Sequence, residues 1–306
     1  MFSLAHLSDL HLGPLPMGSA HRHFAFKRTI GVMNWRLSRH RVHNPAVALA
    51  IAADIVRAAP DHVALTGDIV NVAAHDEFLA AARWMKAFGE PDWISFVPGN
   101  HDTYVRMAWS NGLAHLSPYM QGDMRVPLTQ STPQIDTPFP YVRLRRNVAL
   151  IGVSTAVPQP LHRAAGLLGR TQLDSLAQLL QDLRERGYAR VVMIHHPPLP
   201  GLAQPRKALI DASPLRDVLE AHGAELVLHG HNHEHMLNTL NSRFGTVNVV
   251  GVPSASLIES EHHPVAAWNL YRIQRIAGKW AIDVSVRSFD PATRQVVPLT
   301  EFALSS

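Results

Sequence analysis

The chain has 306 residues, of which 46% are hydrophobic and 17% charged, so it can bury a large core and does not have the composition of a disordered protein. It contains no cysteine, which excludes disulfides, thiolate metal sites and cysteine nucleophiles. The formal net charge of +4 suits an anionic substrate or surface but does not select one.

Six short apolar runs along the chain are each typical of a buried strand. They span residues 2–8, 62–66, 93–97, 148–153, 190–194 and 225–228. Helical patterns lie between these runs, at residues 44–59, 75–88, 171–186 and 213–222. Because the strands alternate with helices, we predict an α/β fold with helices outside the sheet.

The last part of the chain has a different pattern. Residues 245–306 contain short alternating runs and no helical pattern, so we expect antiparallel strands that extend the sheet. Residues 112–140 contain five prolines and are expected to form an irregular excursion over the surface.

Polar side chains that can bind a metal follow five of the six predicted strands. The five blocks are Asp9-Leu10-His11, Gly67-Asp68, Gly99-Asn100-His101-Asp102, His195-His196-Pro197 and Gly230-His231-Asn232-His233. In an open α/β sheet, sites form outside the carboxyl ends of the strands, so these distant blocks can meet in one place. Their mixture of nitrogen and oxygen donors suits Mn²⁺, Fe or Zn²⁺ better than Ca²⁺ or Mg²⁺ alone.

These five blocks, in this order, resemble the calcineurin-like metallophosphoesterase superfamily over about three quarters of the chain. The resemblance implies that residues 1–306 form a single domain, a four-layer α/β/β/α sandwich. It also implies two divalent metal ions, Mn²⁺, Fe²⁺/Fe³⁺ or Zn²⁺. The implied ligands are Asp9, His11 and His233 for the first ion, Asn100, His195 and His231 for the second, and Asp68 as the bridge between them.

Two neighbouring ions can share a water molecule and lower its pKa toward neutrality. The expected reaction is therefore attack of a metal-bridging hydroxide on a phosphate ester. By the same resemblance, His101 lies near the leaving oxygen and protonates it or stabilises its charge. Asp102 is expected either to orient His101 or to start a helix. His196 is expected either to support a ligand or to face the substrate, and Asn71 is a candidate substrate contact.

The block Gly67-Asp68-Ile69-Val70-Asn71 departs from protein Ser/Thr phosphatases, which carry Asp-Arg where Asn71-Val72 stand here. The motifs look more like the bacterial phosphodiesterase branch of the superfamily. This resemblance implies a phosphodiesterase that acts on a small phosphoester substrate.

Residues 13–44 form a predicted basic, amphipathic cap insertion near the N-terminus. Phe26, Ile30, Met33 and Leu37 fall on one helical stripe, and six Lys and Arg residues surround it within residues 22–41. Two interpretations stay open: the stripe packs on the core while arginines line the metal cleft, or the helix contacts an anionic membrane. The segment also resembles the insertion of bacterial enzymes that cleave a UDP-linked diacylglucosamine in lipid A synthesis. A membrane-peripheral pyrophosphohydrolase is therefore the main alternative function.

No apolar run of 18 residues and no signal peptide is recognisable, so we expect a cytoplasmic protein, with peripheral contact to the inner membrane as an option. A nuclease is disfavoured because no large DNA-binding extension follows His233, and we expect no stable nucleic-acid partner. A catalytically inactive metal-binding scaffold is the non-enzyme alternative, although all seven ligands are present. The strands after residue 245 either support a homo-oligomer or only extend the sheet.

Overall fold

Among the described residues, the first sheet has six strands and contains the predicted parallel strands of the N-terminal half of the chain. The computed structural model describes residues 1–15, 26–123, 138–258 and 263–305. In spatial order the strands of this sheet are β12 (Gln295–Ala303), β11 (Lys279–Asp290), β10 (Ala267–Ile276), β1 (Phe2–Leu7), β2 (His62–Leu65) and β3 (Ile94–Phe96). β1, β2 and β3 pair in parallel, whereas β10 pairs antiparallel with β1, so the C-terminal strands extend one side of the sheet.

The second sheet also has six strands. In spatial order they are β4 (Tyr141–Arg145), β5 (Val148–Gly152), β6 (Ala189–Met193), β7 (Leu226–His229), β9 (Gly245–Gly251) and β8 (Met236–Ser242). β5, β6, β7 and β9 run parallel to one another, and β4 and β8 are antiparallel edge strands.

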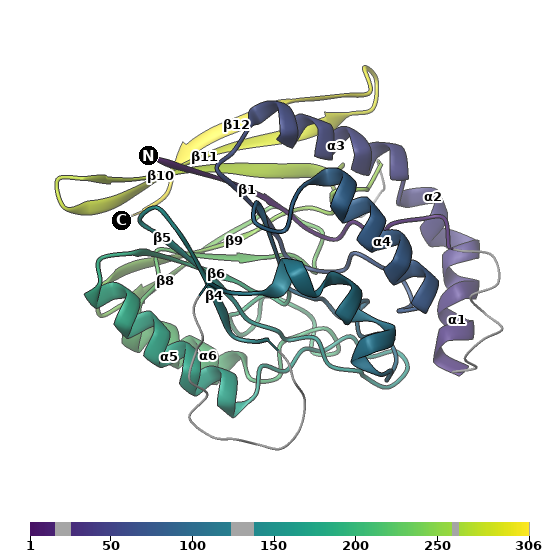
Figure 1. Ribbon diagram of the computed structural model, residues 1–306, viewed down its shortest axis with the longest axis horizontal. Helices are drawn as coiled ribbons and strands as arrows, with labels where there is room; N and C mark the ends of the chain where they lie inside the picture. The colour runs from purple at the N-terminus through teal and green to yellow at the C-terminus, as the bar shows by residue number, and fades with distance from the viewer. Residues whose placement is uncertain (16–25, 124–137, 259–262, 306) are drawn as a thin grey trace.

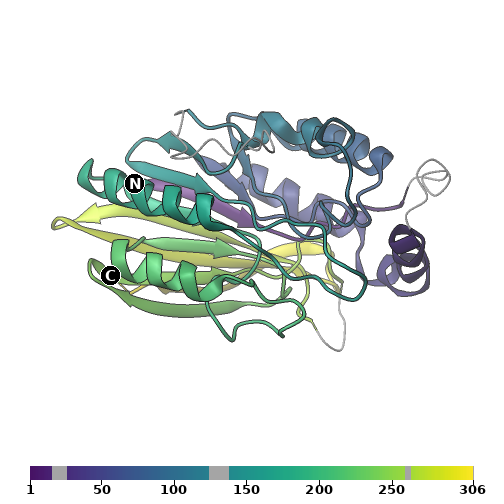
Figure 2. The same cartoon turned by 90° about the horizontal axis from the view of Figure 1, so that it is seen from below.

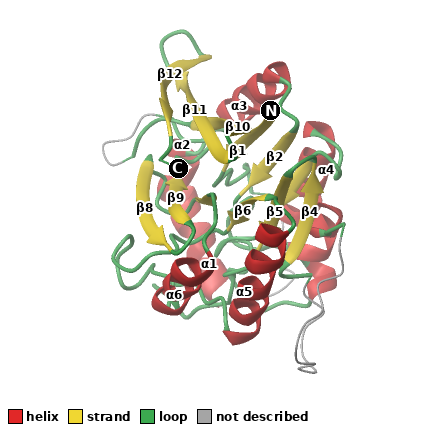
Figure 3. Ribbon diagram, turned by 90° about the vertical axis from the view of Figure 1, so that its left-hand side faces the viewer, coloured by secondary structure: helices red, strands yellow, loops and turns green. Residues whose placement is uncertain are grey.

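Helices cover the outer faces of both sheets. Figures 1 and 3 show α3 and α4 on the side of the first sheet, α5 and α6 on the side of the second, and the strands between the two pairs. These helices are α3 (Pro45–Ala58), α4 (His75–Phe88), α5 (Arg170–Glu185) and α6 (Ala212–His222), and two short 3₁₀ helices lie at Trp109–Asn111 and Leu113–Met120. α3 begins where the sequence predicts, because the Asn44 side chain accepts the amide of Ala46 and proline occupies the first turn.

The alternation of side chains along β6 shows how the layers pack. Val191 and Met193 belong to a buried cluster that joins the two sheets and the α3–α4 side. Val192 and Ile194 point the other way, into a second cluster beneath α5 and α6. The predicted α/β fold with two sheets and outer helices is thus confirmed.

Two strands escaped the sequence analysis, and one was placed in the wrong sheet. β4 and β8 were not predicted, since β8, for example, alternates half-buried and exposed residues and gives little apolar signal. β12 lies within the predicted antiparallel region and pairs antiparallel with β11. β9 was expected to extend the sheet in antiparallel fashion, but it runs parallel to β7 in the second sheet. The excursion expected at residues 112–140 includes a 3₁₀ helix at Leu113–Met120, and residues 124–137 lie outside the described residues.

The insertion contains a continuous helical segment at one end of the molecule (Figures 1 and 2). It consists of α1 (Phe26–Asn34), a π-helical turn at Trp35–Arg39 and α2 (His40–Val42), while residues 16–25 of the insertion lie outside the described residues. None of the helices in the described ranges is long and apolar enough to cross a membrane.

Candidate metal centre

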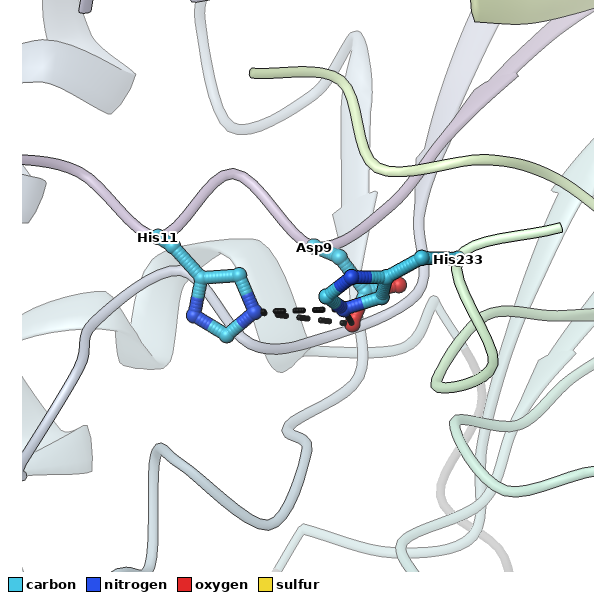
Figure 4. A group of neighbouring side chains, drawn as sticks. All are labelled: Asp9, His11 and His233. Atoms are coloured by element: carbon cyan, nitrogen blue, oxygen red, sulfur yellow. Dashed lines mark hydrogen bonds and ion pairs between the residues drawn. The ribbon is translucent and has the colours of Figure 1, made fainter. Parts of the chain in front are cut away.

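The polar segments that follow β1 and β7 meet in a first group of ligand atoms. Figure 4 shows Asp9, His11 and His233 pointing toward one another. The Nε2 atom of His233 lies 3.2 Å from Oδ1 of Asp9 and 3.4 Å from Nε2 of His11. His11 Nε2 lies 3.9 Å from the same Asp9 oxygen. Two imidazoles and a carboxylate that converge in this way are a donor set that holds a divalent ion.

A second group of ligand atoms lies where β2, β3, β6 and β7 end. Oδ2 of Asp68 lies 3.4 Å from Nε2 of His195, which is 3.1 Å from Oδ1 of Asn100. Ligand atoms of Asp68, His195 and His231 all lie within 4.8 Å of one another. The same Asp68 oxygen lies 3.9 Å from Nε2 of His11 in the first group. Asp68 therefore stands between the two groups, which is the position that a bridging carboxylate requires.

The backbone is strained at most of these residues. Non-glycine residues seldom adopt a positive φ, and they do so mainly where the surrounding structure enforces it, often at functional sites. Five of the seven expected ligands have φ between 42° and 72°, namely Asp9, His11, Asp68, His231 and His233. This concentration marks the site independently of the side-chain distances.

Two glycines allow the strand ends to come this close. A Cβ atom at Gly99 would lie 2.3 Å from Oδ1 of Asp68, and one at Gly230 would lie 2.4 Å from Oδ2 of Asp9. Both contacts are shorter than real Cβ atoms permit, so any larger residue would displace a carboxylate.

Backbone carbonyls set the orientation of two histidine rings. His195 Nδ1 donates to the carbonyl of Thr66 at 2.7 Å, and His231 Nε2 donates to the carbonyl of Lys207 at 2.9 Å. In the neutral rings these bonds leave Nε2 of His195 and Nδ1 of His231 with a lone pair for a metal. Burial lowers the pKa of His231 well below its ordinary value, which keeps this ring neutral.

The buried carboxylates of the site favour the binding of cations. Asp9 and Asp68 are 0% and 2% exposed. Burial tends to raise the pKa of both, but His233 beside Asp9 and His195 beside Asp68 outweigh it, so both pKa values lie below the ordinary value. Burial opposes a charge on His195 too, yet the Asp68 carboxylate raises its pKa to about 9. Two buried carboxylates thus attract positive charge, and a pair of divalent ions fits this donor set.

His101 lies beside Asp68 and His11. Its amide donates to Oδ1 of Asp68 at 2.7 Å, and its Nδ1 donates to the carbonyl of Asn71. Its ring stacks on Tyr104, with centroids 5.5 Å apart and planes 13° apart. One nitrogen of His101 lies within 4.8 Å of ligand atoms of His11 and Asp68. The ring is therefore held close to the metal centre by fixed contacts.

Asp102 has a different position from the one expected. Its Oδ2 accepts the amides of Asp68 and Gly99, both at 2.8 Å, and its Oδ1 accepts the amides of Ile69 and Val70 at 3.0 and 3.1 Å. The side chain is 1% exposed. These four bonds tie the loop after β2 to the loop after β3, so Asp102 positions two segments that carry ligands instead of pointing at a substrate.

The two expected substrate contacts, His196 and Asn71, are buried. Both nitrogens of His196 are bonded within the protein, to the hydroxyl of Thr155 at 2.7 Å and to the carbonyl of Ala164 at 3.0 Å. The Asn71 side chain donates to the carbonyl of Leu12 at 2.9 Å. The ring of His196 is thus bonded within the protein, whereas Asn71 also lines a pocket together with His101 and Tyr104.

Three residues near the first group were missed by the sequence analysis. The ring of His43 is 6% exposed, lies 4.4 Å from the ring of His11, and its Nδ1 is 2.8 Å from the hydroxyl of Ser256. The hydroxyl of Ser254 donates to the carbonyl of Asp9 at 2.6 Å. No motif surrounds these residues, and the pairing of residue 43 with residue 257 and of residue 8 with residue 254 brings them to the site.

A pocket opens beside His101, between α1 and the loop that follows β5. Its volume is about 160 Å³, enough for a small organic group. Asn100, His101 and Tyr104 form one wall, and Ile30 of α1 forms part of another. The loop at residues 157–164 closes the remaining side.

Comparison with solved structures supports the fold. A dimetal phosphatase from Danio rerio is similar over 99% of this chain and 98% of its own, with a TM-score of 0.63 and 12% sequence identity. A purple acid phosphatase from yellow lupin (Lupinus luteus) seeds matches 99% of this chain and 53% of its own, with a TM-score of 0.54 and 12% identity. A sulfate thiohydrolase from Thermus thermophilus matches 97% of this chain and 56% of its own, with a TM-score of 0.52 and 16% identity. At such low identities these likenesses establish the fold alone.

Sequence comparison gives the family. No curated protein matched the chain. The model of the calcineurin-like phosphoesterases matches residues 2–235, a range that includes both groups of ligand atoms. The chain therefore belongs to the calcineurin-like phosphoesterase family, and it has the metal-binding geometry of a metal-dependent phosphoester hydrolase.

Proposed function

We propose that the protein is a phosphodiesterase that acts on small substrates with two divalent metal ions. The observation that carries this proposal is the position of Asp68, 3.4 Å from His195 and 3.9 Å from His11. A shared carboxylate allows two ions to lie close enough to act on one phosphate. The residues that would hold the ions are Asp9, His11 and His233 on one side, Asn100, His195 and His231 on the other, and Asp68 between them. When bound, the ions supply positive charge to the phosphate oxygens and to the attacking water.

His101 is the residue that we assign to the leaving group. Its Nδ1–H is held by the carbonyl of Asn71, so in the imidazolium form Nε2 is the nitrogen that can pass its proton to the departing oxygen, which leaves the neutral ring. The pocket that begins at Asn100 and His101 would receive the alcohol. The stacked ring of Tyr104 limits the movement of His101 and forms part of the same pocket.

Two features favour a diester over a monoester. A diester has a second organic group, and the pocket beside His101 offers it room next to the apolar side chains of Ile30 and Leu161. The Asp-Arg pair of protein phosphatases is also missing after Asp68.

A substrate panel tests the proposal. The Mn²⁺-loaded protein is assayed with bis-p-nitrophenyl phosphate, p-nitrophenyl phosphate and cyclic AMP. We expect kcat/KM for the diester bis-p-nitrophenyl phosphate to exceed that for the monoester at least tenfold. The variant Ile30→Trp, which fills the pocket, should lower diester turnover at constant metal content, whereas Ile210→Trp, at an exposed position, should not. A preference for the monoester overturns the phosphodiesterase assignment.

A pyrophosphohydrolase that acts on a UDP-linked diacylglucosamine is the second candidate. It is favoured by the apolar residues of α1, since Ile30 lines the pocket while Phe26 and Met33 are exposed to solvent on the same helix. Cleavage of the UDP-linked lipid in mixed micelles, together with weak activity toward bis-p-nitrophenyl phosphate, would select this candidate.

Metal analysis identifies the ions, and the hydrolysis assays separate both enzymes from an inactive scaffold. We expect two equivalents of Mn²⁺, Fe or Zn²⁺ per chain. A folded protein that binds two equivalents but hydrolyses no ester in either panel would be the scaffold.

A further inference from the structure

The apolar stripe of the insertion faces solvent. Phe26, Met33 and Leu37 are 76%, 56% and 68% exposed. Single exposed apolar residues are common, but three large ones at i, i+7 and i+11 of a helical segment share one face and form a patch. The interpretation in which this stripe packs on the core therefore does not hold for these three residues.

Contacts on the opposite face fix the helix in this orientation. Arg28 is 6% exposed and donates to the carbonyl of Ala73 at 2.8 Å and to that of Val72 at 3.3 Å. Gly31 packs so tightly that a Cβ atom there would lie 2.8 Å from the Val72 side chain. Val32 joins Val72 in a small buried cluster. Turning the helix so that the stripe faces the core would break these contacts of Arg28, Gly31 and Val32. The apolar face is therefore a stable surface feature.

The charged side chains of the insertion all have one sign. Residues 10–53 contain no Asp or Glu and six Lys or Arg. Two of these cations, Arg36 and Arg41, are exposed on the helical segment. A cationic helix with an exposed apolar face is the arrangement that lies in the interface of an anionic bilayer, where phosphate groups meet the cations and acyl chains meet the apolar side chains.

The patch lies next to the entrance of the candidate active site. Ile30 and Asn34 belong to the same helix and line the pocket that contains Asn100 and His101. Figures 1 and 2 show α1 at one end of the molecule, away from the outer helices α5 and α6. Contact through this end would hold the pocket close to the bilayer surface.

We propose that Phe26, Met33 and Leu37, flanked by Arg36 and Arg41, form a docking surface for membranes that contain anionic phospholipids. The surface binds the bilayer by shallow insertion of the three apolar side chains and by attraction of the two arginines to lipid phosphates. Docking is separate from hydrolysis and does not depend on the identity of the substrate.

Vesicle co-sedimentation tests the proposal with the full-length, Mn²⁺-loaded protein. The vesicles contain phosphatidylcholine alone or phosphatidylcholine with phosphatidylglycerol. We expect the wild-type protein to sediment with the phosphatidylglycerol vesicles at least tenfold more strongly than with phosphatidylcholine alone, and high salt to weaken this binding. The triple variant Phe26→Ser/Met33→Ser/Leu37→Ser should lose binding more than tenfold.

A matched triple variant removes exposed apolar residues elsewhere. Leu237, Ile276 and Leu299 are 53%, 54% and 57% exposed, and their replacement by serine should leave vesicle binding unchanged. Thermal melting and turnover of bis-p-nitrophenyl phosphate check that both variants are folded. Equal loss in both triple variants, or no binding of the wild type to phosphatidylglycerol vesicles, overturns the proposal. The wild type could also dimerise in vesicle-free solution, with only the Phe26→Ser/Met33→Ser/Leu37→Ser variant abolishing the dimer. That result would assign the patch to a second copy of the chain and would also overturn the proposal.

Discussion

The four backbone bonds of Asp102 lead to a sharp prediction about its role. Asp102→Asn keeps the size of the side chain but replaces one acceptor oxygen with an amide group. At best one pair of the four bonded amides keeps its acceptor, and the other pair faces a donor. A buried amide without a partner costs about 1–3 kcal/mol, so we expect a loss of about 3 kcal/mol in the free energy of unfolding.

Such a loss leaves the protein folded, because domains of this kind are stable by about 5–15 kcal/mol. The free energy of unfolding is measured by urea titration, and Mn²⁺ affinity by calorimetry on the same samples. Both should fall, because the loops that Asp102 ties together carry Asp68 and Asn100. Asp182→Asn, at an exposed position on α5, is the matched control and should change stability by less than about 0.5 kcal/mol. If Asp102→Asn keeps wild-type stability and Mn²⁺ affinity while turnover drops, Asp102 acts on the chemistry, and the positioning role is refuted.

Three further substitutions test the site and the fold. His101→Ala should lower kcat about 10²–10⁴-fold with little change in metal content, and an equal loss of both by metal analysis would make His101 a structural residue. Gly99→Ala places a Cβ atom 2.3 Å from the Asp68 carboxylate, so calorimetry should detect fewer than two Mn²⁺ per chain, and two tight sites would contradict this. Asp54→Asn should lower the free energy of unfolding by about 2 kcal/mol at pH 7, because it breaks a buried, two-bond contact with Arg287 at 2.6 and 2.9 Å. Burial tends to raise the pKa of Asp54, but hydrogen bonds from Arg287 and its other partners outweigh this and keep it below its ordinary value. The carboxylate therefore stabilises the fold above about pH 4, and the difference between wild type and variant in urea titrations should shrink as the pH falls below that value; a constant difference would show that the charge is unimportant.

The sequence by itself determined the central parallel strands, the outer helices α3 to α6 and the polar blocks that end the strands. Short apolar runs bounded by glycine and polar residues specify buried strands locally, and Asn44 followed by proline specifies the start of α3. The five polar blocks could be predicted to meet because strand ends in an α/β sheet share one edge. That inference needed only the periodicity of the chain and the direction of its strands.

The roles of individual polar residues depended on tertiary contacts. Asp102 follows His101 in the sequence, yet its carboxylate turns toward amides of residues 68–70 and 99. His196 follows His195, yet Thr155 and Ala164 bury it. The partner of a hydrogen bond lies on another segment in each case, and sequence spacing carries no information about which segment that is.

For the apolar stripe of the insertion, too, the sequence alone did not determine what the side chains face. A spacing of i, i+4, i+7 and i+11 determines that Phe26, Ile30, Met33 and Leu37 share a stripe, and this much the sequence predicted. Whether the stripe meets the core or the solvent was decided by the opposite face of the helix, where Arg28 is anchored by two backbone carbonyls from the segment after β2. Helical periodicity fixes which side chains lie together, while only long-range packing fixes what they face.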